Sequence, residues 1–132
     1  MEYLSWIPEY LVPFLIIITI LVFVHEMGHY LIAKRYGVKV EVFSIGFGRE
    51  LFGWNDKSGT RWKFSLIPMG GYVKMFGDAD PASTPSKSIK KLTPQERARS
   101  LHYKSVGQRS AILFGGPLAN FIFAIFLMSA MF

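Results

Sequence analysis

The residues best suited to chemistry lie together in one apolar segment. His25, Glu26 and His29 fall within residues 11–33, which are otherwise almost wholly apolar. Residues four apart on an α-helix share a face, so the imidazoles of His25 and His29 can converge on one metal ion. Glu26 follows His25 directly, and from there its carboxylate can reach a water molecule on that ion and act as a general base. This spacing predicts a divalent metal site, with Zn²⁺ as the expected ion.

The apolar setting strengthens this prediction. H-x-x-x-H spacing also arises by chance, and a buried His/Glu cluster that only packs is the alternative. An ionised glutamate near the centre of a membrane helix costs at least about 2.5 to 3.5 kcal/mol, so Glu26 needs a compensating partner. A divalent cation held by two neutral imidazoles supplies that partner. The sequence contains no cysteine, which leaves nitrogen and oxygen as the expected ligand atoms.

Two segments are long and apolar enough to cross a bilayer, in a chain of 132 residues that is 51% hydrophobic. Residues 11–33 would form about 34 Å of helix at about 1.5 Å per residue, and residues 111–132 nearly as much. All fifteen Lys and Arg residues fall between Lys34 and Arg109. The positive-inside rule therefore places the central segment in the cytoplasm and both chain ends outside. The basic residues form no helical stripe, so we expect a lipid bilayer as their partner and no nucleic acid.

Alternating patterns predict a small antiparallel sheet between the two spans. The alternating apolar residues are Val38, Val40 and Val42 and, after a turn, Trp62, Phe64 and Leu66. Such a sheet has no place facing lipid, so it should lie against the helices or line a wet cavity. An exposed edge could pair with an extended substrate, or the hairpin could simply cover the helix ends. The pattern leaves both readings open.

The remaining segments complete the expected organisation. Residues 77–91 have linker composition, and Thr93 to Glu96 form a capping-box pattern that predicts a short helix from about Pro94 to Tyr103. The expected divisions are an extracytoplasmic N-terminus (1–10), a first transmembrane helix (11–33), a membrane-associated β region (34–76), a cytoplasmic linker with a short helix (77–110) and a second transmembrane helix (111–132).

The second span carries a polar residue near its cytoplasmic end. Gly115, Gly116 and Pro117 are expected to loosen the helix there, and Asn120 follows them. Asn120 could merely hydrogen-bond a neighbouring helix. We favour a role in lining the catalytic cleft, because it enters from the same side as the predicted metal helix. On the first span, Gly28 should leave room for close approach of another backbone.

Five motifs together give the chain a family likeness. They are HEMGH (25–29), FSIGFG (43–48), IPMGGYVKM (67–75), KSVGQR (104–109) and GGPLANF (115–121). In this order around two spans, they resemble the N-terminal part of site-2-type intramembrane zinc metalloproteases, in the bacterial RseP-like branch.

The resemblance implies zinc-dependent hydrolysis of peptide bonds within a transmembrane protein substrate, such as an anti-sigma factor, in the bacterial inner membrane. It implies that His25 and His29 are zinc ligands and that Glu26 is the catalytic base. It also implies that Gly46, Phe47 and Gly48 belong to a membrane-associated hairpin that holds substrate extended. Asn120 matches a polar position near the active site.

The chain departs from the family pattern at the third ligand. Family members take it from an aspartate in an LDG motif on a later helix, beyond one or more PDZ domains. Asp56, Asp78 and Asp80 lie in turn or linker sequence and match no part of that motif. Because catalytic zinc usually has three protein ligands, we expect this chain to be an N-terminal fragment that has little or no activity alone.

Two other functions are weighed against the protease. A non-catalytic membrane module could keep the contacts to a substrate or partner and lack the chemistry. A metal transporter would need intramembrane ligands on several helices, and only the first span supplies them.

Overall fold

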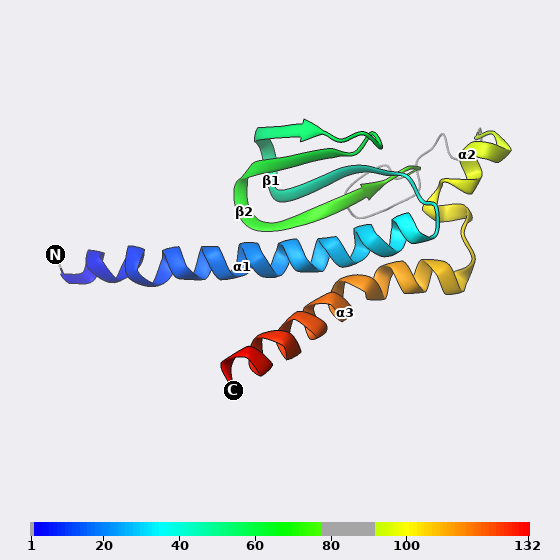
Figure 1. The fold of residues 1–132 in the computed structure, drawn as a ribbon. Coiled ribbons are helices and arrows are strands. Elements are labelled where there is room, and N and C mark those ends of the chain that lie inside the picture. Colours follow the sequence, from blue (N-terminus) through cyan, green and yellow to red (C-terminus); the bar gives the residue numbers. More distant parts are fainter. Residues whose placement is uncertain (1, 78–91) are drawn as a thin grey trace.

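Two long helices and a hairpin make up most of the molecule. The structure is a computed structural model that describes residues 2–77 and 92–132. The predicted linker therefore lies almost wholly outside the described residues. In Figure 1, α1 lies between the hairpin on one side and α3 on the other. The elements in order are α1 (Glu2–Arg35), β1 (Val40–Asn55), β2 (Arg61–Met75), α2 (Pro94–Ala98), the short 3-10 helix η2 (Leu101–Tyr103) and α3 (Val106–Met131).

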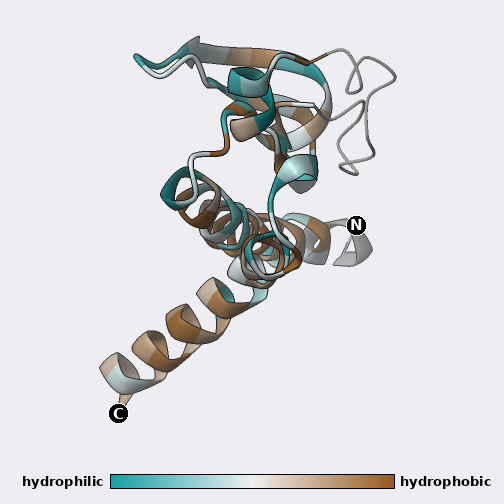
Figure 2. Cartoon of the chain, turned by 90° about the vertical axis from the view of Figure 1, so that its right-hand side faces the viewer, coloured by the Kyte–Doolittle hydropathy of each residue, from teal (hydrophilic) through white to brown (hydrophobic). Residues whose placement is uncertain are grey.

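Both long helices are of the length and composition that can cross a membrane. In the most apolar stretch of α1 none of the residues is buried inside the molecule, and in that of α3 only 17% are. Figure 2 shows the C-terminal half of α3 as mostly apolar. A core helix of a water-soluble protein would bury such a surface. The predicted fold class, two apolar helices with a small antiparallel sheet, is confirmed.

Each helix extends beyond the predicted span. Pro8 and Pro13 lie inside α1 without ending it. At the start of α3, the Ser105 side chain accepts a hydrogen bond from Gln108 N, and the Gln108 side chain accepts one from Ser105 N. This capping box satisfies backbone donors of the first turn, which is why the helix begins before the apolar run.

The two strands form one antiparallel pair that folds back on itself. Ile45 of β1 pairs with both Gly71 and Phe64 of β2, so residues 42–45 lie between residues 71–74 and residues 61–64. Residues 42, 43, 44 and 45 pair in that order with residues 61, 62, 63 and 64. These two segments therefore run in the same direction, although the strands as a whole are antiparallel. Gly46 and Gly48 make the bend in β1, with φ values of +94° and +84° that side chains disfavour. β2 continues without a break through Pro68 and Gly71.

An aromatic core joins the hairpin to α1. Phe43 is 1% exposed, and its ring stacks on Trp62 with centroids 4.5 Å apart. Tyr30 of α1 contacts both rings edge-on, at 5.9 Å from Phe43 and 5.0 Å from Trp62. Offset and edge-to-face aromatic pairs of this kind are stabilising beyond the area that they bury. These contacts place the hairpin along α1, the helix that carries the predicted metal site.

The helix predicted from Pro94 to Tyr103 is wrong in its length. The Thr93 capping box is confirmed, but α2 ends at Ala98 and a separate 3-10 turn, η2, follows. The Ser100 side chain accepts a hydrogen bond from His102 N and so starts a new turn. A side chain that caps the backbone locally competes with continuation of the helix.

Candidate metal centre

The two histidines of α1 converge as their spacing predicts. Their Nε2 atoms are 3.1 Å apart, and the rings meet edge to face with centroids 4.7 Å apart. A tetrahedral zinc ion at about 2.0 to 2.1 Å from two imidazole nitrogens would separate them by about 3.4 Å. The pair therefore fits two neighbouring ligand positions of such an ion.

Gly116 of α3 lets the backbone of that helix pack closely against the two imidazole rings. A Cβ atom at Gly116 would lie 2.5 Å from His29 Nε2 and 2.7 Å from His25 Nε2. At distances this short something must shift, so a larger residue at position 116 would displace the imidazole rings. The residues present thus fit a metal by the spacing of the two ligand nitrogens.

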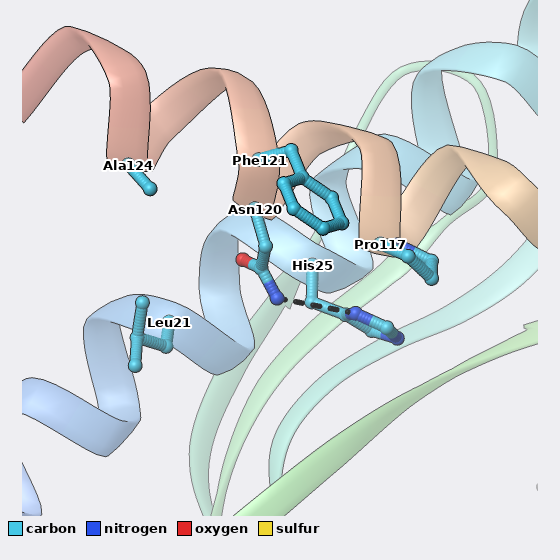
Figure 3. Close-up of a pocket in the computed structure, with 6 residues that line it drawn as sticks. All are labelled: Leu21, His25, Pro117, Asn120, Phe121 and Ala124. Carbon is cyan, nitrogen blue, oxygen red and sulfur yellow. Dashed lines mark hydrogen bonds between the residues drawn. The ribbon is translucent and has the colours of Figure 1, made fainter.

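The far nitrogen of each ring faces a polar partner on α3. His29 Nδ1 lies 2.7 Å from the backbone oxygen of Ile112, a bond in which the ring nitrogen must donate. In a neutral ring this leaves Nε2 of His29 unprotonated and able to bind a metal. His25 Nδ1 lies 3.4 Å from Asn120 Nδ2 (Figure 3). Such outer hydrogen bonds orient histidine ligands and set their protonation.

Glycines hold α1 and α3 close enough for these contacts. A Cβ atom at Gly28 would overlap the carbonyl oxygen of Gly115, and one at Gly115 would lie 2.8 Å from Gly28 O. The close approach predicted for Gly28 is confirmed. The expectation that Gly115 and Gly116 loosen α3 is wrong, because the helix is continuous there and the glycines admit the neighbouring backbone and rings.

Glu26 shares a cavity with one of the histidines. It is 8% exposed and lines a space of about 310 Å³ together with His25, Phe47 and Asn120. Four of the residues given a role by sequence therefore meet at one cavity between the hairpin bend and the two helices. Gly46 and Gly48 do not line it, but form the bend that carries Phe47. The other lining residues are Leu21, Val22, Met69, Gly70 and Gly71.

A second cavity reaches His25 and Asn120 from between the helices. It has a volume of about 520 Å³ and an apolar lining (Figure 3). Pro117 lies inside α3, and α3 bends away from α1 toward its C-terminal end (Figure 1). Proline inside a helix commonly produces such a bend. The lining residues are Leu21, His25, Pro117, Asn120, Phe121 and Ala124.

Some parts of the site were not predicted. Gly116 was noted in the sequence, but not as the residue that faces the histidines. The Ile112 partner is a backbone oxygen, which residue identity does not reveal. Met69, Gly70 and Gly71 lie within a quoted motif that had no site role. Among residues 2–77 and 92–132, no three His, Cys, Asp or Glu side chains gather closely enough to hold a metal ion.

Comparisons with known proteins show the family to which this chain belongs. The family model described as Peptidase family M50 matches residues 13–132. A putative zinc metalloprotease of Rhizobium meliloti is 49% identical over 126 residues, which are 94% of this chain and 34% of that protein. A putative zinc metalloprotease of Agrobacterium fabrum is 48% identical, over 97% of this chain and 34% of its own length.

One of the relatives carries a specific protein name. The regulator of sigma-E protease RseP of Escherichia coli is 48% identical over 117 residues, which are 88% of this chain and 24% of that protein. The chain thus spans about a quarter to a third of the relatives it matches. With the family model covering residues 13–132, the chain belongs to peptidase family M50, in its site-2, RseP-like branch.

Proposed function

We propose that this chain is the N-terminal catalytic part of a zinc-dependent intramembrane endopeptidase. The observation that carries the proposal is the convergence of His25 Nε2 and His29 Nε2, which lie 3.1 Å apart. These two residues would be zinc ligands. Membership of family M50 and the zinc metalloprotease names of the relatives support the choice of metal and of reaction.

Glu26 is the proposed general base. A bound zinc ion would supply the charge that polarises a scissile carbonyl and acidifies a water molecule. The Glu26 carboxylate, in the same cavity as His25, would take the proton from the attacking water and later pass it to the leaving amide nitrogen. Its low exposure excludes most bulk water from this proton transfer.

The substrate proposed is an extended segment of a transmembrane protein. Residues 71–74 of β2 pair with β1 on one side only among the described residues, so they form an edge of the sheet beside the cavity. An extended peptide could add there through main-chain hydrogen bonds, which would also expose carbonyls that a helix shields. Gly46, Phe47 and Gly48 would shape this edge. We propose an anti-sigma-factor-like substrate from the family resemblance, and the name of one relative, regulator of sigma-E protease, supports this choice.

The proposed location is the bacterial inner membrane. The two apolar helices would span it, with the N-terminus outside and the basic central segment in the cytoplasm. Two histidines leave a four-coordinate zinc ion short of a third protein ligand. We place that ligand outside this chain, so the chain alone should have little or no activity.

Zinc content per chain tests the proposal. The 132-residue protein would be purified in detergent as wild type, His25→Ala and Glu26→Gln. We expect zinc in the wild type and in Glu26→Gln, because Glu26 is not a ligand, and loss of zinc in His25→Ala. Zinc in none of the three would contradict a zinc site assembled within this chain. It would mean that the chain is an incomplete half-site, and that zinc binding must be sought in the longer protein.

A further inference from the structure

The polar groups around the two histidines form one continuous chain of hydrogen bonds. Asn120 Nδ2 faces His25 Nδ1, His25 Nε2 faces His29 Nε2, and His29 Nδ1 faces Ile112 O. Figure 3 shows the amide nitrogen of Asn120 turned toward the ring of His25 and its oxygen turned away. Each neutral imidazole has one N–H, so the donor and acceptor in one hydrogen bond of this series determine the donor and acceptor in the next.

Only one arrangement of protons satisfies all three contacts with neutral rings. The Ile112 oxygen can only accept, so His29 carries its proton on Nδ1 and its Nε2 is an acceptor. The Asn120 amide nitrogen can only donate, so His25 Nδ1 is an acceptor and its proton is on Nε2. His25 Nε2–H then donates to His29 Nε2. In this arrangement His29 is ready to bind a metal and His25 is not.

Metal binding therefore requires a change at His25. The lone pair must be on Nε2, so the proton of the neutral ring has to be on Nδ1, by exchange with water and with no net charge change. That proton would then point at the amide nitrogen of Asn120, a donor against a donor. The conflict disappears if the Asn120 amide rotates by 180°, because its oxygen, an acceptor, then faces the Nδ1–H of His25. The nitrogen and oxygen are similar in size, so this rotation has almost no steric cost.

No hydrogen bond among the described residues would be lost by the Asn120 oxygen if the amide rotated. This oxygen is buried and has no hydrogen-bond partner among the described residues. A buried carbonyl oxygen without a partner is unfavourable, so the structure holds an acceptor that is not in use. After the amide turns, this oxygen would accept the Nδ1–H of His25, as carboxylates and carbonyls do for histidine ligands of zinc.

We propose that Asn120 is a positioning residue that sets the tautomer of His25. Its amide donates to the ring in the metal-free chain and accepts from the ring once Nε2 binds the ion. This inference rests on the proposed zinc site. It differs from a simple packing role, because the contact of Gly28 with Gly115 already joins the two helices at this depth.

The test compares variants that change only what position 120 can accept. Zinc affinity would be measured in detergent by competition with a chromogenic chelator. Asn120→Leu removes the acceptor, so we expect affinity to fall about 10- to 100-fold. Asn120→Asp keeps an acceptor and removes the donor, so it should match or exceed the wild type. Ser129→Leu, an exposed polar position on the same helix, is the control and should leave affinity unchanged.

A spectroscopic readout separates this role from a general effect on folding. Two-bond ¹H–¹⁵N correlation spectra of labelled histidine identify the protonated ring nitrogen. We expect His25 to carry its proton on Nε2 in the metal-free wild type and on Nδ1 in the zinc-bound wild type. The carboxylate of Asn120→Asp should place the proton on Nδ1 even without metal.

The outcomes distinguish the inference from the function on which it rests. A wild-type chain that binds no zinc contradicts the zinc site proposed for this chain, while the metal-free tautomer of Asn120→Asp still tests the inference. Zinc binding that Asn120→Leu leaves unchanged overturns the inference alone. So does an Asn120→Asp chain that binds zinc more tightly with an unaltered metal-free tautomer, because the aspartate would then be acting as a ligand itself.

Discussion

Two regions of the molecule hold α1 in opposite ways. The glycine seam (Gly28, Gly115 and Gly116) joins it to α3 through close backbone approach, and this approach brings α3 against the histidine rings. The aromatic core (Tyr30, Phe43 and Trp62) joins α1 to the hairpin through stacked side chains. The seam buries little side-chain surface but tolerates almost no added atom. Stability of the hairpin and geometry of the candidate site should therefore be separable.

The largest expected effect is on the aromatic core. Phe43→Ala removes a ring that is 1% exposed, and such truncations cost about 3 to 5 kcal/mol in free energy of unfolding. Amide hydrogen exchange of residues 40–45 and 61–64 should report this loss of protection. Zinc affinity should change much less, because the seam remains intact.

Phe52→Ala is the matched control for this prediction. Phe52 also stacks on a neighbour, Phe64, with centroids 4.9 Å apart, but it is 58% exposed. Its truncation should leave exchange of the hairpin nearly unchanged. If Phe43→Ala abolished zinc binding as well, the two regions would not be independent and the comparison would fail.

An intermediate effect is expected at the glycine seam. Gly116→Ala would place a methyl group 2.5 Å from His29 Nε2, so zinc affinity should fall at least tenfold, or about 1.4 kcal/mol. Exchange in the hairpin should not change. The same substitution at Gly107, where an added Cβ meets nothing within 4 Å, should leave zinc affinity at the wild-type value. Equal zinc affinity in the wild type, Gly116→Ala and Gly107→Ala would show that the close approach of Gly116 to the histidines does not affect zinc binding.

Features of the fold that depend on local pattern could be predicted from sequence. Apolar length gave the two helices, and alternation gave strands around Val42 and Phe64. The double pairing of Ile45 could not be predicted, because register in a sheet that folds back depends on contacts between segments far apart in sequence. The helix predicted to end at about Tyr103 ends earlier, at Ala98. The reason is local, since Ser100 caps a new turn that helix propensity alone does not reveal.

The candidate site divides in the same way. His25, Glu26 and His29 lie within one helix, so their spacing alone predicts how they converge. What α3 contributes depends on how that helix is placed, and no spacing along the chain encodes it. From sequence, Gly116 was therefore expected to loosen the helix, whereas it packs against the histidine rings. Ile112 is apolar, so the sequence could not indicate that its backbone oxygen faces His29.

The smallest expected effect is at the tip of the hairpin, where a single carboxylate organises the turn. Asp56 Oδ1 accepts hydrogen bonds from Ser58 N and Thr60 N, both at 2.9 Å, and Oδ2 accepts one from Trp62 Nε1 at 2.7 Å. The bond from Trp62 is the main cause that lowers the pKa of Asp56 from 3.8 to about 2. Since Asp56 is only partly buried, solvent screens this contribution and it should be modest.

The sign of the pH dependence follows from the lowered pKa. The contribution of Asp56 is fully present above pH 3.8 and is lost as pH falls through about 2. The indole N–H resonance of Trp62 should therefore shift with a midpoint near pH 2, and Asp56→Asn should abolish this transition. The indole of Trp6, which lies on α1, is the internal control. A midpoint near 3.8 would mean that the hydrogen bonds of the turn do not stabilise the ionised carboxylate of Asp56.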